Sequence, residues 1–285
     1  RLWMLACVKE YLNGFILLPL MLLAAAQAHA MCGGEEVGRG VVTEISGGET
    51  LVLDDGRAVR LIGLLGPKRA TRGPASDARA AMENVLSELT LGKQVSLHIG
   101  ERKRDRYGRL LAHVMLVDDS GSETEWVQGR LVSDGLARVI SFQDNRLCIS
   151  ELLALENEAR HVRKGLWGNG FFAVRPAMAE DLLYRLAQSY EIVEGRVVDV
   201  AAVKGRTYLN FGKDWKPDFT AFIPAKTAGM FEPSASGQKH TITLAELAGK
   251  QIRVRGWLRN YNGPSITVSH PEQIEIIEPD GAIPH

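Results

Sequence analysis

Apolar and polar residues alternate in short runs between residues 36 and 168, and this pattern predicts a succession of strands. Alternation with a period of two buries one face of a strand and leaves the other face in solvent. Turn signals separate the first runs, at Gly47-Gly48 and Asp55-Gly56. The predicted strands comprise residues 38–45, 50–53, 58–64, 95–99 and 111–117.

Apolar residues recur at helical spacing in two longer segments of the same region. Residues 74–89 and 150–164 each carry an apolar stripe, and a short helix is predicted within residues 126–136. Ser150 is a suitable N-cap for the second long helix, and Gly165 is a suitable stop. Five strands with a helix inserted among them predict a small Greek-key barrel, an architecture that binds oligonucleotides on its strand face.

A second strand-rich region follows a linker with a helix, which occupies residues 169–189 and whose Phe171 and Phe172 are predicted to dock between domains. Its predicted strands comprise residues 195–200, 206–211, 219–223, 251–259, 265–269 and 273–277. With one helical segment inserted among them, they predict a second OB-like barrel at residues 190–279. The fold class is therefore predicted to be mainly β with α (α+β), with two barrels.

Aromatic residues of the second region lie close to lysines and arginines in the sequence. Such interleaving suits the binding of single-stranded nucleic acid, but alternate aromatics on strands also form protein cores, and both interpretations stay open. The aromatic residues are Tyr208, Phe211, Trp215, Phe219 and Phe222. Two isolated histidines of this region, His240 and His270, are predicted at the surface.

The first thirty residues differ from both regions. Basic Arg1 and Lys9 precede an apolar run at residues 15–26, and Ala28 and Ala30 are small residues of the kind that a signal peptidase reads. Residues 1–30 are therefore predicted to be a signal peptide of an exported protein, periplasmic or secreted. An uncleaved N-terminal anchor is the alternative, and a membrane contact is expected only in that case.

Cysteine usage and charge refine this picture. Removal of the signal peptide leaves Cys32 and Cys148, which predict one disulfide in an oxidising compartment, with two unrelated buried thiols as the alternative. Lysine plus arginine and aspartate plus glutamate both number 34, so attraction to nucleic acid must come from local patches. The Cys and His spacings do not resemble a zinc site.

One such patch is the segment Glu-Arg-Lys-Arg-Asp-Arg-Tyr-Gly-Arg at residues 101–109, which lies between two predicted strands. Arginine suits phosphate because its planar fork donates two parallel hydrogen bonds. Tyr107 can stack on a base, and Arg106 adds a further charge. The alternative is a solvated hairpin tip in which Asp105, Tyr107 and Gly108 form the turn.

The order of elements, the segment Asp-Arg-Tyr-Gly-Arg at residues 105–109 and the ending Lys-Gly-Leu-Trp-Gly at residues 164–168 resemble the staphylococcal nuclease (thermonuclease) family. The resemblance covers residues 38–168 and implies an OB-fold barrel with calcium-dependent cleavage of DNA or RNA phosphodiesters. Arg60 and Arg109 match the family's two phosphate-binding arginines. Glu49 stands where the family has a calcium-binding aspartate, and these three residues form the implied catalytic set.

The resemblance fails at residues 65–68, where the family has Asp-Thr-Pro-Glu and this chain has Leu-Gly-Pro-Lys. Leu65 replaces the second metal ligand, and Lys68 replaces the glutamate that orients water. Calcium prefers six to eight oxygen ligands, so Glu49 alone predicts a weak metal site. Displaced carboxylates at Asp54, Asp77 or Asp105 are the alternative.

Three functional hypotheses follow. The first is an exported nucleic-acid-binding protein with a degenerate calcium site and weak or no phosphodiesterase activity, in which Lys68, Arg106 and Tyr107 contact phosphate or nucleic acid. The second is an active calcium-dependent endonuclease, and the third is a structural or protein-binding module of the envelope. The expected partner is DNA or RNA, and calcium is the cofactor that the resemblance implies; a small-molecule cofactor is not expected.

Overall fold

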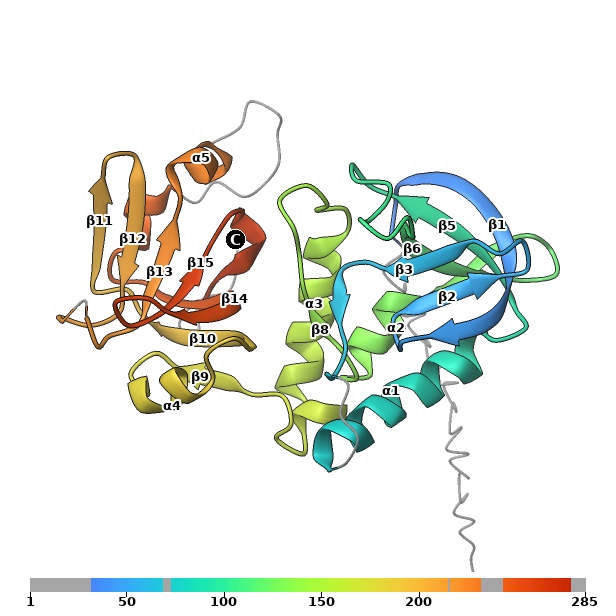
Figure 1. Ribbon diagram of the computed structural model, residues 1–285, viewed down its shortest axis with the longest axis horizontal. Coiled ribbons are helices and arrows are strands. Elements are labelled where there is room, and N and C mark those ends of the chain that lie inside the picture. The colour runs from blue at the N-terminus through green and yellow to red at the C-terminus, as the bar shows by residue number, and fades with distance from the viewer. Residues whose placement is uncertain (1–31, 69–72, 215, 232–242, 278–285) are drawn as a thin grey trace, which may run out of the picture.

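The computed structural model describes residues 32–68, 73–214, 216–231 and 243–277, and it shows two strand-rich domains side by side (Figure 1). The predicted signal peptide, Trp215 and His240 lie outside the described residues. Within the described ranges, the helices are too short or too polar to span a membrane.

The first domain is a curled sheet whose strand order is β3-β2-β1-β5-β6-β7. Its elements are β1 (Glu35–Ser46), β2 (Thr50–Leu53), β3 (Ala58–Leu61), β4 (Leu64–Leu65), α1 (Pro74–Thr90), β5 (Gln94–Ile99), β6 (Leu110–Val117), β7 (Glu123–Trp126), α2 (Val127–Ser133), β8 (Arg138–Val139), α3 (Ile149–His161) and the 3-10 turn η1 (Gly165–Trp167). A parallel pairing between β3 and β6 closes the circuit from β1 through β2, β3, β6 and β5 back to β1. Closure pairs the backbone N–H and C=O groups that an open sheet would leave unpaired along β3. It confirms the first barrel predicted from the sequence.

The predicted strand at residues 58–64 is wrong in its extent. The chain bends at Ile62 and Gly63, and the short strand β4 leaves the barrel to pair with β8. Gly63 has a φ of 79°, and a Cβ there would lie 2.5 Å from the Leu152 side chain of α3. Glycine permits both the positive φ and this close approach, so the bend falls at this position.

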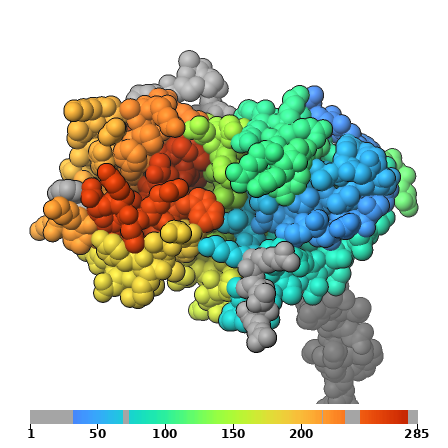
Figure 2. Space-filling view, in the orientation of Figure 1, coloured from blue at the N-terminus to red at the C-terminus, as the bar shows by residue number. Residues whose placement is uncertain are grey.

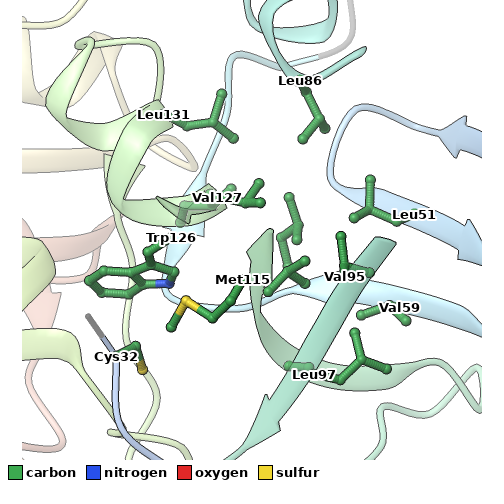
Figure 3. Packing of buried hydrophobic residues seen from close by; sticks show 14 of the residues in the cluster. Cys32, Leu51, Val59, Leu86, Val95, Leu97, Met115, Trp126, Val127 and Leu131 are labelled. Atoms are coloured by element: carbon green, nitrogen blue, oxygen red, sulfur yellow. The ribbon is translucent and has the colours of Figure 1, made fainter. Parts of the chain in front are cut away.

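Helices α1 and α2 cover one opening of the barrel and complete its core. Figure 3 shows side chains from the helices converging on those of the strands. The labelled core residues include Leu86 of α1, Val127 and Leu131 of α2, Trp126, and the strand residues Leu51, Val59, Val95, Leu97 and Met115. Every residue of β6 is buried, which explains why its sequence is apolar apart from His113 and does not alternate.

The second domain repeats this pairing order. Its elements are β9 (Val174–Pro176), α4 (Glu180–Arg185), β10 (Tyr190–Arg196), β11 (Asp199–Val203), β12 (Arg206–Asn210), β13 (Thr220–Ile223), α5 (Ala225–Ala228), η2 (Gly229–Phe231), η3 (Leu244–Leu247), β14 (Gln251–Asn260), β15 (Pro264–Thr267), η4 (Pro271–Gln273) and β16 (Ile274–Ile276). The pairings run from β11 through β12, β13, β15 and β14 to β10, which continues into β11 across Val197 and Val198. The parallel pair β13–β15 corresponds to β3–β6 of the first domain. The relation of this domain to known OB-fold modules stays a prediction.

Charged and polar side chains link the two domains, and in the space-filling view the C-terminal strands lie directly against the first domain (Figure 2). Arg255 of β14 is 1% exposed and donates a hydrogen bond of 2.7 Å to Glu156 of α3, which is fully buried. It also binds Glu275 of β16 and donates to the carbonyl oxygen of Val139. The Arg255 guanidinium lies between two carboxylates, so it neutralises charge that burial would otherwise make costly.

A second contact corrects the prediction for His270. This side chain is 1% exposed, not at the surface, and its Nε2 lies 2.6 Å from the Ser141 hydroxyl of the first domain. Nearby, Arg146 pairs with Glu272 across the same boundary. An isolated histidine carries no periodic signal, and its burial here follows from the docking of the second domain.

The linker aromatics lie between the domains, in a small apolar cluster. Phe172 is buried against Trp167, with ring centroids 5.3 Å apart, and Ile192 of β10 belongs to the same cluster. Phe171 packs against Phe172. The disulfide between Cys32 and Cys148 is confirmed, and it ties the start of the first domain to the residue before α3.

Candidate nucleic-acid-binding site

Glu49 lies at the end of the Gly47-Gly48 turn, immediately before β2, and is 7% exposed. One carboxylate oxygen is 2.5 Å from the Nη2 atom of Arg60. The other oxygen accepts a hydrogen bond from the backbone N–H of Gly66 at 2.5 Å. Both oxygens are therefore engaged within the protein, and the carboxylate joins β2 and β3 to the segment after β4.

Leu65 ends β4, Lys68 follows the segment after it, and the partners of both lie toward the boundary between the domains. Leu65 is the ladder partner of Arg138 in β8. The Lys68 ammonium lies 5.8 Å from the centre of the Trp257 ring, which belongs to β14 of the second domain. The quadrupole of an aromatic ring attracts a cation that lies over its face. The Lys68 ammonium therefore contacts the second domain instead of joining Arg109 in one phosphate-binding group.

Arg109 is held by Asp105 and Thr50. Its guanidinium donates to Asp105 at 2.7 Å and to the Thr50 hydroxyl at 3.0 Å. The other oxygen of Asp105 accepts the backbone N–H groups of Tyr107 and Arg109. Partial burial opposes ionisation of this carboxyl, but the hydrogen bonds from Arg109 and from the two N–H groups outweigh it and lower the pKa of Asp105. The hairpin tip is thus an ordered turn, in which Asp105 fixes the position of the Arg109 guanidinium.

These residues border a pocket of about 450 Å³. Among its lining residues are four arginines, two aspartates and two aromatic side chains: Arg60, Arg102, Arg106, Arg109, Asp105, Asp144, Tyr107 and Phe142. Tyr107 is 69% exposed, and the Arg106 guanidinium lies 5.0 Å from the centre of its ring. Within the described part of the chain, Arg106 has no carboxylate within ion-pair distance, whereas Arg102 pairs with Asp144. The pocket therefore offers guanidinium groups and exposed rings, which suit a phosphate chain and its bases.

The structure adds Arg79, which the sequence analysis did not identify. Arg79 of α1 donates hydrogen bonds to Glu83, one turn further along, and to the carbonyl oxygen of Pro67. A Cβ on Gly48 would lie 2.5 Å from its Nη2 atom, so the guanidinium lies against the Gly47-Gly48 turn. The signal available in the sequence was the i, i+4 spacing of Arg79 and Glu83, which is common on helix surfaces.

Calcium does not fit this arrangement. The single acidic residue matched to the family's metal site has both oxygens engaged, and Arg60 and Arg79 occupy its surroundings. Among the described residues, the groups that bring three potential metal ligands together are Glu36 with His98 and Glu123, and the disulfide cysteines with His113. Neither group includes Glu49, so we derive no catalytic step through a metal.

Among the described residues, none of the three alternative carboxylates joins Glu49 in a group of three potential metal ligands. Asp54 accepts the backbone N–H of Val41 at 3.0 Å. Asp105 is bound to Arg109, and Asp77 lies in the first turn of α1. The displaced-carboxylate hypothesis thus gains no support from the geometry.

The first domain is thus a closed barrel with an arginine-lined pocket on its surface. Residues 58–169 match the family model described as staphylococcal nuclease homologue. The chain is also 25% identical over 132 residues to the thermonuclease of Staphylococcus hyicus, an alignment that covers 45% of this chain and 75% of that protein. The first domain is therefore a staphylococcal-nuclease-like domain, which supports a nuclease-type function with nucleic acid as the ligand.

Proposed function

We propose that this chain is an exported nucleic-acid-binding protein whose nuclease-like domain has a degenerate calcium site and weak or no phosphodiesterase activity. The observation that carries the proposal is the engagement of Glu49 by Arg60 and the Gly66 N–H. A metal would have to displace a guanidinium and break a buried hydrogen bond to reach this carboxylate. The pocket with Arg106 and Arg109 stays accessible to phosphate.

Chemically, this domain has the groups that bind charge but not the groups that activate water. Guanidinium forks stabilise the negative charge of a phosphodiester, both in the ground state and as it develops during attack. Hydrolysis also needs a base or a metal to generate the nucleophile. Lys68, at the family's glutamate position, is a cation that contacts Trp257 and supplies neither.

Export is supported by the disulfide between Cys32 and Cys148, since such bridges form in oxidising compartments. We place the protein in the periplasm or outside the cell on this basis, together with the apolar run and small residues of the N-terminal segment.

The test combines hydrolysis and binding with the disulfide-intact protein. We expect no difference in cleavage of single-stranded DNA between calcium and chelator. We expect binding that weakens with salt, and Arg106→Ala should lower the slope of log affinity against log salt by about 0.7, the value for one contact to a single strand. Arg106 contacts the Tyr107 ring and has no carboxylate partner among the described residues, so the substitution breaks no ion pair there.

Arg130→Ala is the matched control, because Arg130 pairs with Glu125 and Asp134 away from the pocket. Its salt slope should equal that of the wild type. Calcium-stimulated cleavage that is lost in Arg109→Ala would show an active endonuclease and contradict the proposal. Salt-independent retention of DNA, or none, would favour the structural hypothesis.

A further inference from the structure

Two aromatic side chains stack on the outer surface of the second domain. Tyr208 of β12 and Phe222 of β13 are directly paired across the strands, and their ring centroids are 5.2 Å apart. Both are partly exposed. Their neighbours along the two strands are buried inside the domain: Thr207, Leu209, Ala221 and Ile223. Since side chains alternate along a strand, both rings must lie on the opposite, outer face.

Small residues flank this pair on both sides. The partner of Tyr208 in β11 is Ala201, and the partner of Phe222 in β15 is Thr267. Neither side chain is large enough to cover an aromatic ring. The row therefore presents a ring platform across the middle of four strands. By contrast, Phe211 and Phe219 are 2% and 0% exposed and belong to the core, so the core interpretation holds for these two aromatics.

Polar groups and cations border the platform along the strands. Arg206 lies on the same face of β12 as Tyr208, two residues earlier, and is exposed. On the other side, the next row across the strands is polar throughout: Asp199, Asn210, Thr220, Ser265 and Arg259. Asp199, the one acidic member of this row, accepts a hydrogen bond from Asn210 at 3.3 Å. Two guanidinium groups and one engaged carboxylate leave this face complementary to an anionic chain.

We propose that this face binds single-stranded nucleic acid by stacking bases on Tyr208 and Phe222, with Arg206 and Arg259 next to the phosphates. Stacked aromatics beside cations accept any base, because every base has a π-face. The platform lies on the strands farthest from the first domain (Figure 1), so it is separate from the arginine pocket. The inference extends the proposed function, with which it shares the class of ligand but no residue.

The experiment uses the full, disulfide-intact chain and two oligonucleotides of equal length, one of thymidines and one with abasic sites throughout. They carry the same phosphates, so they differ only in the bases. We expect Tyr208→Leu with Phe222→Leu to weaken binding of the thymidine oligonucleotide by about five- to hundred-fold, the range for loss of base stacking. Binding of the abasic oligonucleotide should not change.

The control is Tyr184→Leu, which removes an exposed ring from α4 of the same domain. It should change neither affinity. Matching circular dichroism spectra and melting temperatures show that the variants are folded. The inference would be overturned if the wild type and the double variant had equal affinity for the thymidine oligonucleotide. Equal affinity of the wild type for both oligonucleotides would overturn it as well.

Arg106→Ala separates the two proposals. It should lower the affinity for both oligonucleotides by the same factor if the first domain binds phosphate. A loss in Tyr208→Leu with Phe222→Leu and none in Arg106→Ala would retain the platform and reject the arginine pocket. The reverse pattern would retain the pocket alone.

Discussion

Glu49 shows how a residue of the right chemistry at the right position can acquire another role. The sequence places a carboxylate there, and only the structure shows that Arg60 and the Gly66 N–H bind both of its oxygens. The substitution at residue 68 also gains an explanation that no local pattern contains, because its partner Trp257 is distant in sequence. Sequence reasoning identified the residue types of the pocket, but it could not assign their partners.

His270 gives a prediction at the same scale. Burial lowers its pKa to about 4 from an ordinary value of 6.5, with a smaller opposing effect of Glu272. The unfolded chain therefore binds a proton that the folded chain does not between pH 6.5 and 4, and stability falls as pH decreases through this window. His270→Asn should make the free energy of unfolding less dependent on pH there, by up to about 1.4 kcal/mol per pH unit.

The measurement is urea unfolding at half-unit steps from pH 4 to 7. The buried His113 has a pKa of about 4 for the same reason, so some dependence must remain. His161→Asn, an exposed change at the end of α3, is the control substitution. An unchanged slope in His270→Asn would contradict the interpretation.

Periodicity predicted the strands and helices correctly where one face of the element is buried. The predicted boundaries were wrong where tertiary contacts set them. Residues 58–64 are almost continuously apolar, so no pattern marked the bend at Gly63. Likewise, the single strand predicted at residues 195–200 is divided between β10 and β11, because the chain turns from one partner strand to another. The first barrel, by contrast, was predicted from the number of strands with an inserted helix and from the family resemblance, although the strand order was not.

The glycines of the junction between α2 and η1 give a prediction at this scale. Gly135 has a φ of 68°, and a Cβ on it would overlap the carbonyl oxygen of Lys164. Gly165 approaches the carbonyl oxygen of Asp134 in the same way. Gly135→Ala should lower the free energy of unfolding by about 2–4 kcal/mol, because it adds a backbone clash to the cost of a positive φ.

Gly92→Ala is the matched control for this change. Gly92 has a φ of 73° with no atom near its Cβ position, so its cost should be about 1 kcal/mol. Chemical denaturation of both variants gives the comparison. Equal losses would mean that the close approach between α2 and η1 does not limit this position.

At the scale of the whole molecule, charged groups that are buried between the two domains join them. Arg255 binds Glu156 of the first domain and Glu275 of its own domain, and Arg160 also reaches Glu275 at 2.9 Å. Burial raises the pKa of Glu275, but Arg255 and Arg160 outweigh it and lower the pKa to about 2. No sequence pattern indicated this network, since its contacts between the two domains join residues about a hundred positions apart.

Arg255→Met should therefore be strongly destabilising, by about 3–5 kcal/mol, because it removes the buried guanidinium that Glu156 and Glu275 share. We expect one calorimetric transition in the wild type and two in the variant, as the domains lose their coupling. Arg57→Met, which removes an exposed pair with Asp55, should cost about 1 kcal/mol or less. Two transitions in the wild type would contradict the coupling of the domains.

The disulfide has a consequence for the order of events in the life of the chain. Cys32 and Cys148 are 116 residues apart, so the bridge encloses nearly all of the first domain in one covalent loop. Closing a loop of this length restricts the unfolded chain by about 5 kcal/mol in the chain-entropy account. A chain without the bridge, as in a reducing compartment, lacks this contribution and is correspondingly easier to keep unfolded. Under the export that we propose, the bridge delays full stability until the chain has crossed the membrane and meets an oxidant.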